Sequence, residues 1–206
     1  MSNATNQATQ FERVMFFSDA VFAIAITLLV IEIHPPHGKF DNEAALANAL
    51  LAMIPQYIGF IVSFFVIGRF WTGHHRICGA IAKADDKFIR INLMFLMLVA
   101  FGPFPTALIS LYPDHATGVI VYTGWLILIG LANHRLAAYA EKTPSLWVKG
   151  ATKAELTRFV RMSWTPILLG VLAFTLGMIR PILSLIPLMG APVIMWALNK
   201  WVLDRV

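Results

Sequence analysis

The sequence predicts an all-α integral membrane protein with six transmembrane helices. Of its 206 residues, 58% are hydrophobic and 13% are charged, whereas soluble domains average about 45–50% apolar and about 25% charged residues. The mean hydropathy of +0.71 agrees with this composition. A helix needs about 20 apolar residues to cross a hydrocarbon layer of about 30 Å, so the chain has room for about six spans. A soluble enzyme domain, a coiled coil and a disordered chain are therefore excluded.

Apolar runs between polar breaks place the spans within a single domain, residues 1–206. The expected spans are residues 14–33, 46–70, 88–111, 119–140, 159–179 and 182–203. The third contains Pro103 and Pro105, which predict a kink or an early end because proline lacks the backbone N–H of a helix interior. Only Arg180 and Pro181 separate the fifth from the sixth, so these two form a tight hairpin.

The N-terminal tail, residues 1–10, is polar and uncharged. We expect it to be frayed, and it lacks the basic start and cleavage site of a signal peptide. With this tail in the cytoplasm, 14 of the 16 Lys and Arg residues fall on the cytoplasmic side, and only Lys39 and Arg180 fall outside. The positive-inside rule thus predicts that both termini are cytoplasmic. The net charge of +5 reflects this topology and does not indicate a nucleic-acid partner.

Ionisable and polar residues cluster at the start of the first span, from Arg13 to Asp19. A charged side chain at mid-span costs at least about 2.5–3.5 kcal/mol, so such residues are candidates for function. Six residues correspond to about 240° of helix rotation, so Arg13 and Asp19 cannot pair within one helix. Partners are expected in residues 69–76 or at Asn92. Ser18, Asp19, Trp71 and a histidine either tie two helices together, or Asp19 carries protons or ions.

The histidines predict no metal site. His74 and His75 are adjacent, so they point about 100° apart on a helix, and no carboxylate cluster accompanies them. The one cysteine, Cys78, excludes a disulfide or a thiolate cluster. No resident metal or cofactor is expected, and no convergent set of acid, base and nucleophile predicts an enzyme.

Helical periodicity groups part of the first span on one face. Ile24 shares its face with Thr27, Leu28 and Ile31, whereas Asp19 lies about 140° away. If this helix lined a pore, Ile24 and Leu28 would form an apolar constriction. From periodicity alone, a face of this kind more often contacts lipid or packs against another helix.

The run Arg13-x-x-x-Phe17-Ser18-Asp19, continued by Ala-Val-Phe-Ala-Ile-Ala-Ile-Thr to Thr27, resembles the signature of the bacterial branch of the transmembrane protein 175 family. These are potassium channels of prokaryotes, endosomes and lysosomes. The segment from Trp71 to Arg76 also resembles the family. The resemblance implies a six-span subunit that assembles as a homotetramer, with the first helix of each subunit lining a central pore.

The same resemblance assigns roles to individual residues. It places the narrowest point of the pore at Ile24 and further lining positions at Thr27, Leu28 and Ile31, so that potassium would pass near Ile24 and Thr27. The remaining motif residues would form a structural or gating network: Arg13, Phe17, Ser18, Asp19, Trp71, His74 and His75. No Thr-Val-Gly-Tyr-Gly filter occurs in the chain, as the resemblance implies.

The expected function is passive conduction of potassium through a hydrophobic gate in a bacterial plasma (inner) membrane, with other copies of the chain, lipid and potassium ions as partners and no nucleic acid. A proton-coupled secondary cation transporter that uses Asp19 is the alternative. A membrane enzyme that uses His74 or His75 and a purely structural assembly protein are weaker hypotheses. Saturable flux coupled to a proton gradient would distinguish the transporter from the channel.

Overall fold

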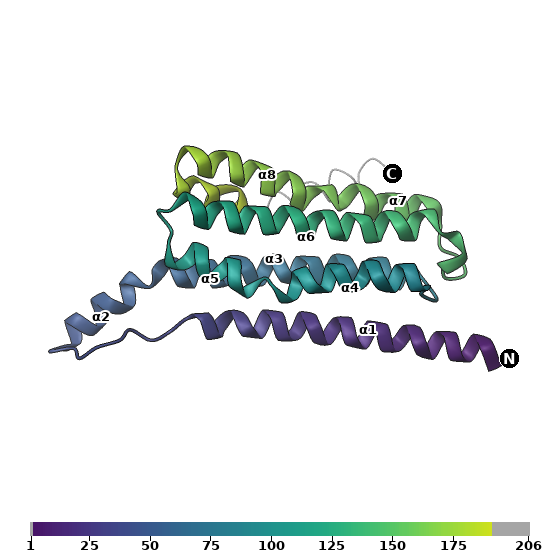
Figure 1. The fold of residues 1–206 in the computed structure, drawn as a ribbon, viewed down its shortest axis with the longest axis horizontal. Coiled ribbons are helices and arrows are strands. Elements are labelled where there is room, and N and C mark those ends of the chain that lie inside the picture. The colour runs from purple at the N-terminus through teal and green to yellow at the C-terminus, as the bar shows by residue number, and fades with distance from the viewer. Residues whose placement is uncertain (1, 191–206) are drawn as a thin grey trace.

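The computed structural model describes residues 2–190, which form helices joined by short connections. The α-helices are α1 (Ser2–Leu28), α2 (Glu43–Ala52), α3 (Ile54–Gly79), α4 (Asp86–Ala100), α5 (Pro103–Leu111), α6 (Ala116–Lys142), α7 (Lys153–Met162) and α8 (Trp164–Ile179). Short 3-10 helices follow α1, α6 and α8, at Leu29–Glu32, Pro144–Leu146 and Pro181–Ser184. All helices except α2 run side by side along the long axis (Figure 1).

The bundle has three layers (Figure 1). Helix α1 forms one outer layer, α3, α4 and α5 form the middle layer, and α6, α7 and α8 form the other outer layer. Five helical segments of the described chain are long and apolar enough to cross a membrane: Thr9–Glu32, Ile54–Gly79, Asp86–Leu111, Ala116–Lys142 and Lys153–Ile179. The protein is therefore a multi-pass membrane protein.

The expected second span, residues 46–70, is wrong at both ends. Helix α2 stops at Ala52, and the membrane-length helix α3 runs from Ile54 to Gly79. The break has a cause in the sequence, because Pro55 has no N–H to continue the hydrogen bonds of α2, whereas proline is tolerated in the first turn of a helix, where it lies in α3. Because α2 is itself apolar, the apolar run in the sequence did not indicate this break.

Two other spans are divided as well. The third breaks between Ala100 and Pro103, as the prolines predict, and the Thr106 hydroxyl donates to the Gly102 carbonyl at 2.9 Å. The fifth consists of α7 and α8, which meet at Ser163. The expected frayed tail is instead helical, since α1 begins at Ser2. Of the sixth span, residues 182–190 are helical and residues 191–203 lie outside the described chain.

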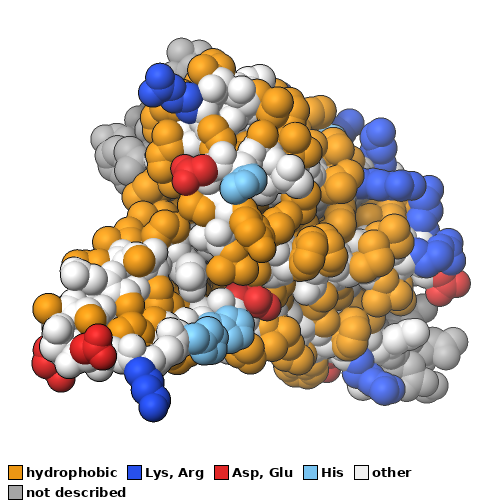
Figure 2. All heavy atoms as spheres, turned by 60° about the vertical axis from the view of Figure 1, so that its left-hand side comes forward, with side chains coloured by type: hydrophobic (Ala, Val, Ile, Leu, Met, Phe, Trp, Pro, Cys, Tyr) orange, Lys and Arg blue, Asp and Glu red, His pale blue; other side chains and the backbone are white. Residues whose placement is uncertain are grey.

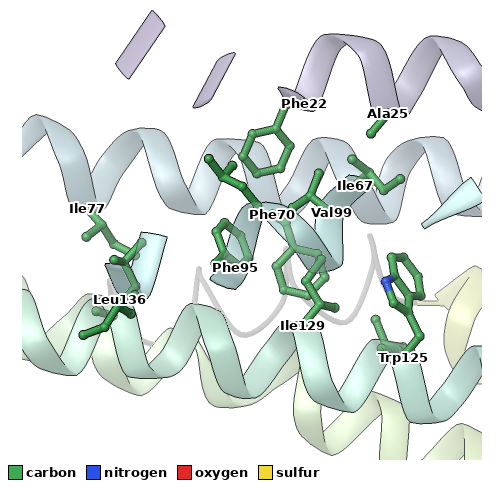
Figure 3. Close-up of a cluster of buried hydrophobic side chains, with 14 of the residues drawn as sticks. Phe22, Ala25, Ile67, Phe70, Ile77, Phe95, Val99, Trp125, Ile129 and Leu136 are labelled. Atoms are coloured by element: carbon green, nitrogen blue, oxygen red, sulfur yellow. The ribbon is translucent and has the colours of Figure 1, made fainter. Parts of the chain in front are cut away.

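The core lies between the three layers. Phe22 of α1 packs near Phe95 of α4, with ring centroids 5.8 Å apart, and Phe95 contacts Phe70 of α3 at 6.1 Å. Ile129 of α6 continues this cluster from the opposite layer (Figure 3). Full burial of such side chains contributes about 1.5–3 kcal/mol each where water is displaced. In lipid, tight packing and polar contacts take over that role.

The surface agrees with a membrane setting. Apolar side chains cover much of the flank, and most Lys and Arg side chains in this view gather at one end (Figure 2). That end contains the α3–α4 and α6–α7 connections, which are joined by backbone hydrogen bonds from Ala82 to Leu146 (2.7 Å) and from Val148 to Ala80 (3.1 Å). The basic loops therefore form one connected end of the bundle.

Candidate functional site on the first helix

Helix α1 has two unlike faces. Its packed face consists of Ser18, Phe22, Ala25 and Leu29, each at most 1% exposed. Its other face is open along the helix and comprises Phe17, Ala20, Ile24, Thr27, Leu28 and Ile31. The face that periodicity assigned to Ile24, Thr27, Leu28 and Ile31 is thus continuous and uncovered in the single subunit, with Ile24 57% exposed.

A chain of buried hydrogen bonds holds the packed face of α1. The Asn92 side-chain amide of α4 donates to Ser18 Oγ at 3.0 Å, and Ser18 Oγ donates to the Val14 carbonyl at 2.8 Å. Asn92 Oδ1 lies 2.8 Å from His74 Nε2 of α3. Because Oδ1 can only accept, Nε2 carries the proton in this arrangement. These hydrogen bonds join α1, α3 and α4 and fix the three helices in one arrangement.

Asp19 makes a second link between α1 and α3. The Trp71 indole donates from Nε1 to Asp19 Oδ1 at 2.9 Å. The ring of His75 lies against Trp71, with centroids 5.7 Å apart. Asp19 is half-buried at the border between the two faces of α1. The partner of the Asp19 carboxylate thus comes from residues 69–76, one of the two places that the sequence suggested for Arg13 and Asp19. Asn92, the other place, bonds to Ser18 instead.

The seven residues expected to form one network are divided in the structure. Ser18 and His74 are buried in the Asn92 chain, and Asp19 belongs to the separate link through Trp71 and His75. Arg13 and Phe17 instead lie exposed on α1. Their exposure follows from helix geometry, since residues 13 and 17 are one turn apart on the same face.

The surroundings of His74 were not found from the sequence. Its ring stacks on Phe95 with centroids 5.8 Å apart and an interplanar angle of 19°, and Phe22 lies at 5.7 Å. Cys78 Sγ is 3.6 Å from His74 Nε2. Phe22 and Cys78 each lie four residues from a network member on the same helix. Helical periodicity could therefore have predicted these two residues as neighbours of the network.

A second buried polar cluster joins α3, α5 and α6. Ser63 Oγ lies 3.1 Å from the Tyr122 hydroxyl and 2.8 Å from Thr106 Oγ1. All three side chains are at most 2% exposed. The sequence could have indicated this cluster, because its three residues are polar side chains within apolar spans. This cluster fixes the middle layer on which α1 rests.

One titratable group outside the spans has a shifted pKa. Burial raises the pKa of the Asp85 carboxyl, but hydrogen bonds from the Tyr139 hydroxyl and the backbone N–H groups of Lys87 and Phe88 lower it more, so the pKa lies below its ordinary value. The positive charge of Lys87 acts in the same direction. The Tyr139 hydroxyl donates to Asp85 Oδ2 at 2.6 Å. This carboxylate therefore joins the start of α4 to α6 at the basic end.

Within residues 2–190, no group of three His, Cys, Asp or Glu side chains is placed to hold a metal ion.

The fold and the site define a multi-pass helical membrane protein. One face of its first helix is held by contacts with other helices, and the opposite, apolar face is exposed. The family model described as the endosomal/lysosomal potassium channel TMEM175 matches residues 13–103, from Arg13 within α1 to Pro103 at the start of α5. A potassium channel of Chamaesiphon minutus is 40% identical over 147 residues, which are 70% of this chain and 72% of the relative. The chain belongs to the TMEM175 family.

Solved and more distant relatives extend the comparison. The crystal structure of a lysosomal potassium-selective channel TMEM175 homolog from Chamaesiphon minutus superimposes with a TM-score of 0.81 at 34% identity, covering 93% of this chain and 98% of that one. A human relative, named an endosomal/lysosomal proton channel, is 24% identical over 136 residues. This chain covers 66% of its own length in that match and 27% of the human protein.

Proposed function

We propose that the protein is a passive, potassium-permeable channel formed by four copies of the chain around a central pore. The observation that carries the proposal is the open face of α1, where Ile24 is 57% exposed and Ile31 is 62% exposed although the opposite face is packed. In a homotetramer, four such faces would line the axis. The names of the relatives as potassium channels support the same assignment.

The constriction would be a ring of four Ile24 side chains. Isoleucine offers no oxygen ligand, so a narrow ring excludes water and is closed, and a small dilation wets it. Thr27 lies one turn beyond, where its hydroxyl is 2.9 Å from the Ile24 carbonyl and 3.0 Å from the Ala23 carbonyl. Since the hydroxyl proton points to the backbone, the oxygen lone pairs remain available to a passing cation. Potassium sheds its water more readily than sodium, so selectivity would be modest.

The buried Ser18–Asn92–His74 chain and the Asp19–Trp71 link would set the position of α1 and therefore the width of the pore. Arg13 and Phe17, which are exposed in the single subunit, would act through a neighbouring subunit. The basic end of the bundle would face the cytoplasm of a bacterial plasma membrane, with both termini on that side. This orientation follows the positive-inside rule.

Ion flux from proteoliposomes tests the proposal directly. Wild-type protein should release potassium faster than sodium. Ile24→Ala should raise the flux and lower the ratio of potassium to sodium, because the ring widens. Ile26→Ala is the matched control, since Ile26 is half-buried on the packed side. Equal flux from wild type, Ile24→Ala and Ile26→Ala would place the pore elsewhere.

Proton-coupled cation transport through Asp19 is a second candidate. It is favoured by the position of this carboxylate within a span, beside the open face of α1, and by the proton-channel name of the human relative. Transport of this kind predicts saturable flux that depends on a proton gradient and disappears in Asp19→Asn. Channel conduction predicts flux without a proton gradient, with Asp19→Asn affecting assembly more than permeation.

A further inference from the structure

Two exposed arginines lie at a similar depth in the layer of α6, α7 and α8. Arg135 follows Ala116, the first residue of α6, by about 19 residues, which is a rise of about 28 Å. Arg161 of α7 precedes Ile179, the last residue of α8, by about 18 residues, or about 27 Å. Because a hydrocarbon layer is about 30 Å thick, both arginines lie near its boundary at the basic end of the bundle.

A contact between α6 and the junction of α7 with α8 brings the two arginines to one surface. His134 Nδ1 lies 2.9 Å from the Ser163 hydroxyl, and the rings of His134 and Trp164 have centroids 4.6 Å apart. Arg135 directly follows His134, and Arg161 lies one turn before Trp164 on the same side of the helix. Trp164 is 46% exposed. Its ring therefore lies on the surface that carries both arginines.

These arginines have no counter-charge in the described chain. Arg135 and Arg161 are exposed, and within residues 2–190 neither forms an ion pair. The Glu141 carboxylate, further along α6, already accepts a hydrogen bond from the Thr157 hydroxyl. A guanidinium group presents a fork of N–H donors that fits the oxygens of a phosphate. The surface is thus complementary to an anion that reaches it from the membrane boundary.

The same surface becomes apolar toward the other end of the bundle. Four exposed residues continue the faces of Arg135 and Trp164 at spacings of three and four: Leu131, Leu128, Leu168 and Val171. A soluble anion would use only the arginines. A phospholipid would use both parts, with its phosphate at the arginines and an acyl chain along the leucines. An exposed tryptophan between them is typical of the membrane interface.

The position of this surface in the fold favours lipid over a second copy of the chain. Helices α6, α7 and α8 form the layer opposite α1 (Figure 1). In the proposed tetramer the open face of α1 lines the axis, so the opposite layer lies at the periphery. A second copy of the same surface would also bring arginine against arginine, and like charges repel.

We propose that the surface formed by Arg135, Arg161 and Trp164 binds an anionic phospholipid of the cytoplasmic leaflet. The phosphate accepts hydrogen bonds from the two guanidinium groups, and an acyl chain lies along Leu131 and Leu168. Basic sites between transmembrane helices on the cytoplasmic side recognise anionic headgroups in this way. The inference rests on the proposed function for the orientation of the bundle and for the peripheral position of this layer.

Lipid titration followed by native mass spectrometry tests the site in the full-length, delipidated protein in detergent. The probes are phosphatidylglycerol and phosphatidylcholine with identical acyl chains. Wild type should bind phosphatidylglycerol about tenfold more tightly, and Arg135→Gln/Arg161→Gln should reduce that preference to about twofold or less. Lys149→Gln/Lys153→Gln is the matched control, since it removes the same charge from exposed positions at the same end. This control should keep the preference of wild type.

Equal preferences in the two double variants would overturn the lipid site. Displacement of phosphatidylglycerol by excess inorganic phosphate would also overturn it, because the arginines would then recognise a free anion.

The same spectra report the oligomeric state and so separate this inference from the proposed function. A tetramer without a preference for phosphatidylglycerol overturns the lipid site and leaves the proposed channel assembly intact. A monomer whose preference depends on Arg135 and Arg161 overturns the assembly and retains the lipid site. A monomer without a preference overturns both.

Discussion

At the scale of single residues, the site depends on one asparagine. Asn92 donates to Ser18 and accepts from His74, and all three are at most 1% exposed. Neither a hydroxyl nor an imidazole can find water at that depth. Removing the shared partner leaves the buried Nε2 proton of His74 without its amide acceptor, which costs about 1–3 kcal/mol, while Ser18 keeps its hydrogen bond to the Val14 carbonyl. Asn92 therefore controls the position of α1 although it does not lie on α1.

We predict that Asn92→Leu destabilises the protein by about 1–3 kcal/mol, because the buried His74 imidazole loses its hydrogen-bond acceptor. The measurement is thermal or denaturant unfolding in detergent. Asn133→Leu is the matched control, because Asn133 is also buried on a helix of the bundle but its Oδ1 has no hydrogen-bond partner. That variant should be neutral or more stable. Equal losses in both variants would show that the Asn92 network adds nothing beyond packing.

The Asp85 carboxylate makes a prediction about pH. Its pKa in the folded protein is lowered, so its stabilising effect is fully present above the unfolded value of about 3.9 and is lost as the pH falls through the folded value. The melting temperature of wild type should exceed that of Asp85→Asn at neutral pH, and the difference should shrink below about pH 4. Asp86→Asn, at the exposed neighbouring position, also removes one negative charge and is the matched control.

At the scale of helices, periodicity predicted more than apolar run length did. The shared face of Ile24, Thr27, Leu28 and Ile31 followed from the rotation per residue, which is a local property. The second span was misplaced because α2 is as apolar as a true span, and Pro55 was the only mark of its end. The sequence marked a histidine and Asn92 as candidate partners of the motif, but the bond between His74 and Asn92 became visible only in the structure. Contacts between helices depend on packing that spacing along one helix does not encode.

Close packing between α3 and α5 yields a prediction for glycine. A Cβ at Gly59 would overlap the Ser110 hydroxyl, whereas a Cβ at Gly68 on the same helix would meet nothing within 4 Å. Gly59→Ala should lower the free energy of unfolding by about 1–3 kcal/mol because the helices must move apart. Gly68→Ala should leave it unchanged or raise it by up to about 1 kcal/mol. Unfolding of the two variants under identical conditions checks the difference, and equal stability would contradict the close contact.

At the scale of the whole molecule, the two ends of the bundle differ in charge, and this difference predicts which end faces the cytoplasm. The basic connections lie together at one end (Figure 2), and the opposite end carries Lys39, Asp41 and Glu43 beside α2. A positively charged end is retained in the cytoplasm during insertion. In the proposed orientation, the open face of α1 runs from the cytoplasmic end to the outer end. The same asymmetry orders the functional parts along the proposed pore, with the Asp19–Trp71 link first, Ile24 next and α2 outermost.

This orientation can be measured with two lysine positions that are both exposed and lie at opposite ends, Lys149 in the α6–α7 connection and Lys39 before α2. In intact bacterial cells, a membrane-impermeant maleimide should label Lys39→Cys and not Lys149→Cys. After the membrane is opened, both variants should react. The buried Cys78 of the wild type should remain unlabelled in both conditions. Labelling of Lys149→Cys alone in intact cells would invert the molecule. It would place the Asp19–Trp71 link at the outer end of the pore and the α2 helices at the cytoplasmic mouth.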